Sequence, residues 1–288
     1  MEAARLVAVG RLRGDRPAPS ALDARRDRPA LRARRDRKSI LSIFTRADGR
    51  ERVAVPLWDG ILSAFGSIAI GFGAALLAMI PIFLAAVLML GTLPSTAPGR
   101  PLLSLVEIVF YCAGGWFAWN RLRAARGMPF RPLTAADVRV AALSIGALLV
   151  VRAATIVQLV LTNQTRHVQS GFEHFSVATQ VPALTAISVG LAVLGMVVLG
   201  PLVEEIVFRG LLFGALAPRL GVLGAAALTA ILFGAAHGDL VLFPSLAALG
   251  FVAALSYAAT GNLTVPLLVH VFNNAFASAI LVAGSLAR

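Results

Sequence analysis

Charged residues are scarce in this sequence. Only 14% of its 288 residues are charged, against roughly a quarter in a typical soluble domain, whereas 58% are hydrophobic and the mean hydropathy is +0.82. This composition excludes a soluble globular protein. We therefore predict an all-α fold, a polytopic transmembrane helical bundle.

Cysteine is nearly absent as well, since Cys112 is the only one. A single cysteine excludes an intrachain disulfide and a cysteine-based zinc site. No apolar run begins before about residue 60, so we expect no signal peptide.

Positive charge is concentrated at the N-terminus. Residues 1–55 contain 14 Arg and one Lys against seven acids, which is +8 of the total charge of +12. The stretch has no apolar period, so we expect a disordered Arg-rich tail. A nonspecific nucleic-acid arm would look similar, but a cytoplasmic tail beside anionic lipid is the simpler interpretation. We predict membrane lipid as a partner and no specific nucleic acid.

Long apolar runs occupy most of the remaining chain. A membrane span needs about 20 such residues. We predict seven spans, within a range of six to eight, at 60–92, 102–120, 138–162, 183–217, 221–237, 244–260 and 263–285. The range is open because Gly200–Pro201 could divide 183–217 into two short helices. We favour one kinked helix, which places Glu204 and His237 at similar depths.

The loops predict an orientation. Five Arg lie in the 121–139 loop, whereas the 93–101 and 163–182 loops contain one each. By the positive-inside rule the basic loop and the N-terminus are cytoplasmic. The Arg-rich composition favours a bacterium with a GC-rich genome, and hence a bacterial inner membrane.

Two charges lie inside predicted spans of the N-terminal half. Glu107 and Arg152 occur in consecutive antiparallel spans at comparable depths. Because an unpaired charge in lipid costs about 2.5–3.5 kcal/mol on insertion scales, we expect them to form a structural ion pair.

Three polar motifs lie in three apolar segments of the C-terminal half: "EEIVFR" with Glu204, Glu205 and Arg209, "FGAAH" with Phe233 and His237, and "HVFNN" with His270, Asn273 and Asn274. Glu205 and Arg209 share a helical face at i,i+4 spacing and can pair. Each motif alone has a structural explanation. Together they predict a polar cavity inside the membrane, because charged groups in spans usually face one.

These residue types suit water activation. Glu205, ionised beside Arg209, would disfavour a second charge on Glu204, so Glu204 could act as a general base. His270 and Asn274 offer N–H donors for an oxyanion. The set is typical of amide hydrolysis.

The same motifs, in the same order, resemble the EExxxR, FxxxH and HxxxN motifs of the CPBP family, the CAAX-protease and bacteriocin-processing intramembrane endopeptidases, called Abi proteins in bacteria. The resemblance covers about residues 183–285. It implies Glu204 as the water-activating base with His237, Glu205 and Arg209 in support, and His270 with Asn274 in the oxyanion hole. It also implies a helical bundle whose cavity opens toward the cytoplasm. We accordingly divide the chain into the tail 1–55, N-terminal helices 56–180 and a catalytic core 181–288.

No cofactor is expected. If a metal were present, zinc held by Glu204, His237 and His270 would be the candidate. The HExxH spacing of zincins is absent, and the guanidinium of Arg209 disfavours a nearby dication. The GxSG motif of rhomboids and the GxGD motif of aspartyl proteases are absent too, since Asp239 in "HGD" lacks the preceding glycine.

The sequence is also compatible with two other functions. A transporter would show polar groups in both halves of an inverted repeat, but the three motifs lie in the second half only. A non-catalytic scaffold or bacteriocin-immunity protein would share the composition. The favoured hypothesis is a protease that cleaves membrane-associated peptides or proteins.

Overall fold

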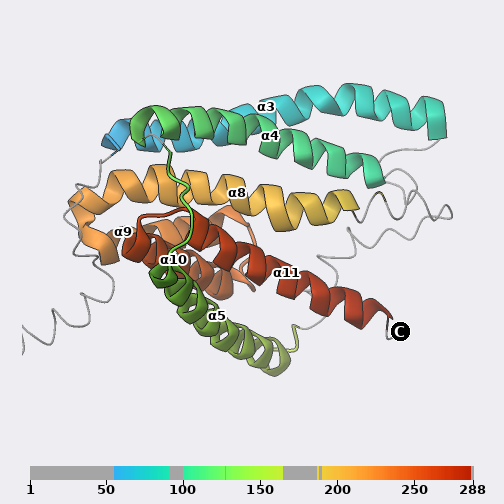
Figure 1. The fold of residues 1–288 in the computed structure, drawn as a ribbon. Coiled ribbons are helices and arrows are strands. Elements are labelled where there is room, and N and C mark those ends of the chain that lie inside the picture. The colour runs from blue at the N-terminus through green and yellow to red at the C-terminus, as the bar shows by residue number, and fades with distance from the viewer. Residues whose placement is uncertain (1–54, 91–99, 127, 165–186, 188–189, 287–288) are drawn as a thin grey trace, which may run out of the picture. The chain divides into compact units, whose positions relative to one another are not determined.

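The computed structural model describes residues 55–90, 100–126, 128–164, 187 and 190–286, which all belong to one compact unit, Phe44–Arg288. Throughout these ranges the secondary structure is helical and no strand occurs, which confirms the all-α class (Figure 1). The predicted tail 1–55 lies outside the described residues except for Val55. The division between 180 and 181 remains a prediction.

Helices α3 (Leu57–Leu90) and α4 (Arg100–Arg126) pack along each other. Glycine allows their close approach: a Cβ at Gly114 would lie only 2.6 Å from the carbonyl oxygen of Ser67. The Ser67 hydroxyl donates a hydrogen bond of 2.7 Å to the Gly114 carbonyl. Small residues at such contacts are the usual means of joining membrane helices.

Helix α5 (Ala135–Leu161) begins with a capping box. The Thr134 hydroxyl accepts a bond from the Asp137 N–H, and the Asp137 carboxylate accepts one from the Thr134 N–H, at 3.2 and 3.0 Å. This arrangement satisfies two backbone donors that the first helical turn leaves unpaired. α5 then packs against the last two helices of the chain.

A long helix from Gly190 carries the first motif. Its segments are η1 (Leu194–Leu199), α8 (Gly200–Glu204), η2 (Glu205–Phe213) and the start of α9 (Gly214–Ala236). The backbone stays helical through Gly200–Pro201, which confirms the prediction of one helix there. η1 and η2 are π-helical, a wider form that recurs at functional sites. The chain turns only at Gly221, whose φ of 70° leaves the helical region.

The last two helices are α10 (Phe243–Thr260) and α11 (Thr264–Leu286). One Asp239 carboxylate oxygen accepts the N–H groups of Val241 and Leu242 just before α10, so Asp239 lies in the loop after α9 as expected. Gly261, at φ 61°, ends α10 with an N–H bond to the carbonyl of Tyr257. This left-handed residue is a common helix terminator.

The element η2 is the centre of the bundle. It contacts α3 and α4 on one side and α9 and α10 on another, and Figure 1 shows the long helix between these groups. All nine residues of η2 are buried. Its charged side chains therefore face protein and not lipid.

Four helical segments are long and apolar enough to cross a membrane: Leu57–Ala85, Ala135–Leu161, Gly190–Ala236 and Phe243–Thr260. The predicted spans 102–120 and 263–285 correspond to α4 and α11, which do not meet the same criterion over their described residues. Seven crossings are thus not confirmed.

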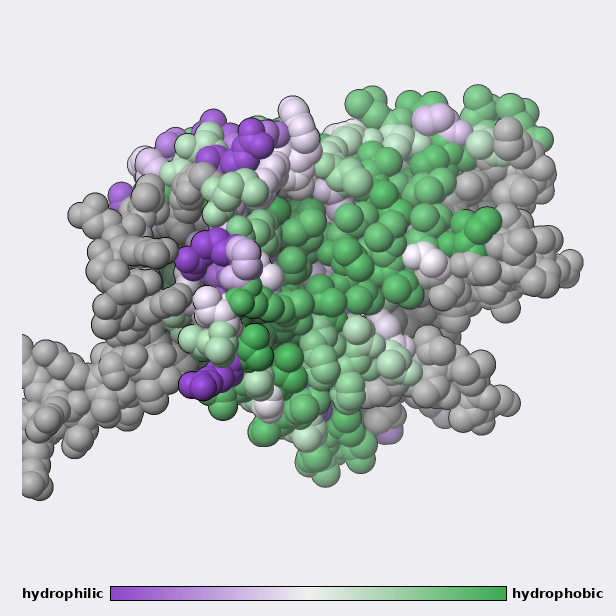
Figure 2. All heavy atoms as spheres, in the orientation of Figure 1, coloured by the Kyte–Doolittle hydropathy of each residue, from purple (hydrophilic) through white to green (hydrophobic). Residues whose placement is uncertain are grey.

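Hydrophobic residues cover much of the visible face in Figure 2, and hydrophilic ones gather near the end where α3 begins.

Candidate active site

The buried ion pair of Glu205 and Arg209 forms the base of the site. Glu205 Oε1 lies 2.9 Å from Arg209 NH1, which confirms the pairing expected from their spacing. Both residues are essentially inaccessible, at 0% and 1% exposure. At such depth each charge depends on the other, because an isolated buried ion costs several kcal/mol.

Other groups complete the surroundings of Arg209. Its NH2 donates a hydrogen bond of 3.1 Å to the backbone carbonyl of Gly250 in α10. Its guanidinium carbon lies 4.9 Å from the ring centroid of Phe233 in α9, a cation–π distance. A cation that the sequence places in an apolar segment is thus enclosed by three elements.

His270, on α11, joins the two glutamates. Its Nδ1 lies 2.8 Å from Glu205 Oε1, and its Nε2 lies 3.6 Å from Glu204 Oε2. Because an ionised carboxylate only accepts, Nδ1 carries the proton that is donated to Glu205. This bond fixes the ring orientation and aims Nε2 at Glu204.

The gap between Glu204 and His270 is suited to a water molecule. At 3.6 Å the two atoms are too far apart for a direct hydrogen bond, but one water at about 2.8 Å could contact both. The Glu204 side chain is 22% exposed, unlike that of Glu205. Glu204 is therefore the carboxylate that solvent can reach, whereas the buried Glu205 accepts the hydrogen bond that orients His270.

Asn274 is held by a second chain of hydrogen bonds. Arg152 Nε donates to Asn273 Oδ1 at 3.1 Å, and Asn273 Nδ2 donates to Asn274 Oδ1 at 3.0 Å. Asn274 Nδ2 then donates to the carbonyl of Met196 at 2.9 Å. The amide of Asn274 is thereby oriented, and its Nδ2 retains a second hydrogen for another acceptor.

Pro201 explains why the Met196 carbonyl can accept this bond. Proline has no N–H, and the N–H of Gly200 bonds back to the carbonyl of Gly195. Neither residue donates to Met196. A polar backbone group in an apolar helix needs a partner, and the Asn274 side chain supplies it.

The predicted ion pair between Glu107 and Arg152 is wrong. Arg152 bonds to Asn273, and Glu107 lies instead within electrostatic range of Glu204. A Cβ at Gly195 would lie 3.6 Å from the Glu107 carboxyl carbon, so this side chain extends over the long helix. The two residues, predicted to lie at comparable depths, therefore have different partners in the structure.

Tyr111 is a neighbour of the site that sequence reasoning missed. Its hydroxyl would lie 3.2 Å from a Cβ at Gly200, and it interacts electrostatically with Glu204 and Glu107. Glu107 and Tyr111 are four residues apart and share one face of α4. That spacing was the available signal, in a chain with only two tyrosines.

His237 stands apart from the network. Its Nδ1 donates to the carbonyl of Phe233 at 2.8 Å, and the residue is exposed. The Phe233 ring packs against the rings of both His237 and His270, at centroid distances of 4.7 and 5.6 Å. No hydrogen bond or ion pair joins His237 to Glu204, Glu205 or His270, all of which the structure describes.

The donor set does not form a three-ligand metal site. Among the described residues, no group of three or more His, Cys, Asp or Glu side chains has a suitable arrangement. Of the three residues considered for zinc, Glu204 and His270 converge, whereas His237 hydrogen-bonds to the carbonyl of Phe233. Catalytic zinc usually has three protein ligands, so these residues as placed do not fit it.

Comparison with known proteins agrees with the motifs. Residues 186–276 match the family described as "Type II CAAX prenyl endopeptidase Rce1-like". This segment contains all three motifs and every candidate site residue. The resemblance inferred from the sequence is confirmed over this segment.

Two curated relatives match part of the chain. "Putative membrane peptidase YdiL" of Bacillus subtilis (strain 168) is 37% identical over 79 residues, which is 27% of this chain and 32% of the relative. "Membrane-embedded CAAX protease MroQ" of Staphylococcus aureus (strain USA300) is 32% identical over 85 residues, 27% of this chain and 34% of the relative. The match thus spans about a third of each relative. No solved structure matches significantly.

Proposed function

We propose that this protein is an intramembrane endopeptidase that hydrolyses peptide bonds in membrane-associated peptides or proteins. One observation carries the proposal: Glu204 and His270 Nε2 lie 3.6 Å apart at the end of a buried chain through Glu205 to Arg209. The Rce1-like match over 186–276 and the two peptidase-named relatives support the same activity.

In the proposed reaction Glu204 takes a proton from a water molecule whose oxygen attacks the carbonyl carbon of the scissile bond. The resulting oxyanion accepts hydrogen bonds from His270 and from the remaining Nδ2 hydrogen of Asn274. Glu204 then returns the proton to the leaving amine as the C–N bond breaks. The products are a carboxylic acid and an amine.

His270 serves this reaction best as an imidazolium. Its Nδ1–H is committed to Glu205, so it can donate to an oxyanion only from a protonated Nε2. The family resemblance implies His237 as a second contact of the water, and we keep that role in the proposal; with Nδ1 bonded to the Phe233 carbonyl, its Nε2 is the nitrogen that would accept.

We propose that no metal takes part, because only two of the three candidate zinc ligands converge. The test is a chelator. Activity should survive incubation with 1,10-phenanthroline, and metal analysis of the active protein should find well under one zinc per chain. Loss of activity that added zinc restores would overturn this part of the proposal without affecting hydrolysis itself.

The proposed setting is a bacterial inner membrane with the N-terminus in the cytoplasm. The support is the Arg-rich tail and the five Arg between residues 121 and 139, at the end of α4, in the connection that follows and at the start of α5. A reporter that works only in the cytoplasm should be active when it is fused to the N-terminus. A reporter that works only outside the inner membrane should be inactive there.

The decisive experiment compares the wild-type chain with Glu204→Gln. Mass spectrometry of membranes that contain either protein should reveal peptide termini made only by the wild type. A peptide with one of these cleaved sequences then serves as the substrate for the purified protein in liposomes, where the rate of cleavage is measured. We expect the rate to fall by a factor of at least about 100, because glutamine cannot take the proton. Cleavage at an unchanged rate by Glu204→Gln would refute the proposal.

A matched control is Asp239→Asn. It also exchanges a carboxylate for an amide, but the amide oxygen can still accept the N–H groups of Val241 and Leu242. We expect full activity.

If a cellular phenotype of this protein persists when Glu204, His237 and His270 are all replaced, a non-catalytic scaffold role would be favoured.

A further inference from the structure

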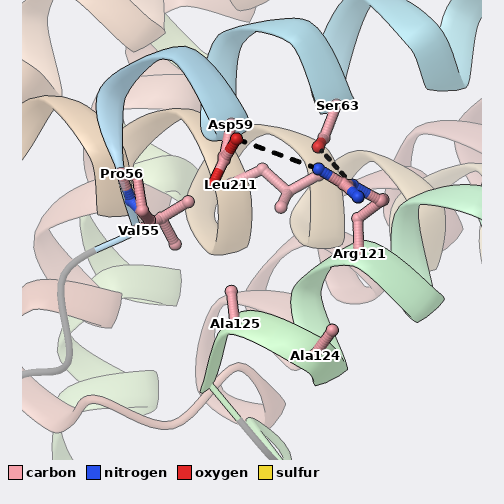
Figure 3. A pocket seen from close by; sticks show the side chains of 8 residues that line it. All are labelled: Val55, Pro56, Asp59, Ser63, Arg121, Ala124, Ala125 and Leu211. Carbon is pink, nitrogen blue, oxygen red and sulfur yellow. Dashed lines mark hydrogen bonds and ion pairs between the residues drawn. The ribbon is translucent and has the colours of Figure 1, made fainter.

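A cavity of about 370 Å³ lies where α3 begins and α4 ends (Figure 3). Its walls come from the start of α3, the last turns of α4 and Leu211 of η2. Sites for small molecules have volumes from about 300 Å³ upward, so this one has room for more than a single ion.

One wall of the cavity is charged. Arg121 extends from α4 toward α3, where its Nε donates to the Ser63 hydroxyl at 3.0 Å and its NH2 lies 4.0 Å from Asp59 Oδ1. Figure 3 shows its guanidinium between Asp59 and Ser63. At 4.0 Å the ion pair is loose, and the guanidinium keeps donors that these two contacts do not use.

This pair is not needed to hold the helices together. The two side chains are 49% and 59% exposed, and exposed ion pairs contribute little to stability. Close backbone contacts such as Gly114 with Ser67 already join α3 to α4. Charges that add little to the fold, on the wall of a cavity, are available to a ligand.

The side chains near the cavity are of the kinds found where a helix enters the membrane at the level of lipid headgroups. Trp58, next to Asp59, is 68% exposed, and tryptophan prefers the interface of a membrane. Leu62 and Phe65, one and two turns further along α3, are 65% and 63% exposed. An amphipathic ligand with its polar part in the cavity would thus have apolar helix surface beside its acyl chains.

We propose that this cavity binds the headgroup of a zwitterionic phospholipid with a primary amine, phosphatidylethanolamine, with the phosphate on Arg121 and the ammonium on Asp59. A guanidinium recognises phosphate through charge-assisted hydrogen bonds, and a carboxylate accepts those of an ammonium. A purely anionic lipid would satisfy Arg121 but be repelled by Asp59. A choline headgroup has no N–H to donate to the carboxylate.

The inference does not depend on peptide hydrolysis. Leu211 lines the cavity and lies two residues beyond Arg209, but no charged residue of the candidate active site lines it. Binding can therefore be measured whether or not the protein proves to be a protease.

The test is native mass spectrometry of the full chain released from micelles with phosphatidylethanolamine, phosphatidylglycerol or phosphatidylcholine at equal concentrations. We expect one phosphatidylethanolamine to be retained about tenfold more than either other lipid, as befits a pair of charge-assisted hydrogen bonds. Equal retention of all three lipids would overturn the proposal. Free phosphoethanolamine, which lacks acyl chains, should compete only weakly; full competition would identify a soluble ligand instead.

Variants separate the two halves of the headgroup. Arg121→Gln should lower the retention of all three lipids, because each carries the phosphate, and Arg121→Lys should keep part of the retention because the charge remains. Asp59→Asn should retain phosphatidylethanolamine and phosphatidylglycerol equally. Arg123→Gln is the matched control, since Arg123 is exposed on the same helix end and does not line the cavity. If Arg123→Gln lowers retention as much as Arg121→Gln, the effect is general surface charge and the proposed site is wrong.

Discussion

Two carboxylate–guanidinium pairs of this protein have the same chemistry and opposite surroundings. Glu205 and Arg209 lie 2.9 Å apart and are almost fully buried, whereas Asp59 and Arg121 lie 4.0 Å apart and are about half exposed. The buried pair also binds His270 and the Gly250 carbonyl. Among the described residues, the exposed pair has Ser63 as the one further hydrogen-bonded contact of Arg121.

The difference shows that burial decides what an ion pair does. In the interior each partner compensates a charge that could not otherwise be there, so the pair can hold a third group such as His270 in place. At the surface water already solvates both charges, and a ligand can displace it. Substitutions at the buried pair should therefore have much larger effects than substitutions at the exposed pair.

The largest effect is expected on breaking the buried pair. Arg209→Gln leaves the Glu205 carboxylate buried without its cation, and we expect it to lower the free energy of unfolding by about 3–5 kcal/mol. Unfolding by denaturant in detergent micelles measures this change. The double variant Glu205→Leu with Arg209→Met removes both charges and should recover much of the stability while peptide cleavage stays abolished. A stable Arg209→Gln variant would contradict the contrast.

The two histidines of the candidate site also differ in burial, and we expect their substitutions to differ in effect. His270 is 1% exposed and bonded to Glu205, so His270→Asn should lower the cleavage rate by a factor of about 100 to 1,000, as loss of an oxyanion donor does. His237 is exposed and has one hydrogen bond, so His237→Asn should lower the rate less, by about tenfold for a lost contact to water. Rates under single-turnover conditions measure both. A larger loss for His237→Asn would mean that the exposed ring, not the buried one, governs the reaction.

An intermediate effect is expected for Arg152, which acts on Asn274 through Asn273. Arg152→Gln removes the charged donor to Asn273 and should lower kcat about tenfold with little change in KM, because a hydrogen bond to a charged group is lost. Arg152→Lys retains a donor and should restore part of the rate. Arg139→Gln, on the exposed start of the same helix, is the control. A change confined to thermal stability would assign Arg152 a structural role only.

The smallest effect belongs to the exposed pair. Asp59→Asn and Arg121→Gln should each change the free energy of unfolding by less than about 1 kcal/mol, because water replaces the lost partner. The same unfolding assay measures it, in lipid-free detergent. A loss comparable to that of Arg209→Gln would remove the distinction between the pairs.

Much of the site could be predicted because local spacing determines it. The pairing of Glu205 with Arg209 follows from their i,i+4 positions, and the three motifs lie in separate helices as expected. The contact of His270 with Glu205 joins residues 65 positions apart. Only the packing of α11 against the long helix decides which face of each meets the other.

The wrong pairing of Glu107 with Arg152 has the same cause. A sequence indicates how deep a residue lies in a span, because depth follows from counting along the helix. It does not indicate how each helix is rotated about its axis. In the structure Arg152 bonds to Asn273 and Glu107 lies near Glu204, so the comparable depth that we predicted did not imply a contact.

Pro201 makes a contact between two helices possible because it has no backbone N–H. Without its N–H, the main chain of the long helix presents an unused acceptor at Met196, and α11 attaches there through Asn274. An amino acid with an N–H at position 201 would offer that carbonyl a partner within its own helix and weaken the attachment. A residue usually regarded as a helix breaker thus specifies the register between two neighbouring helices.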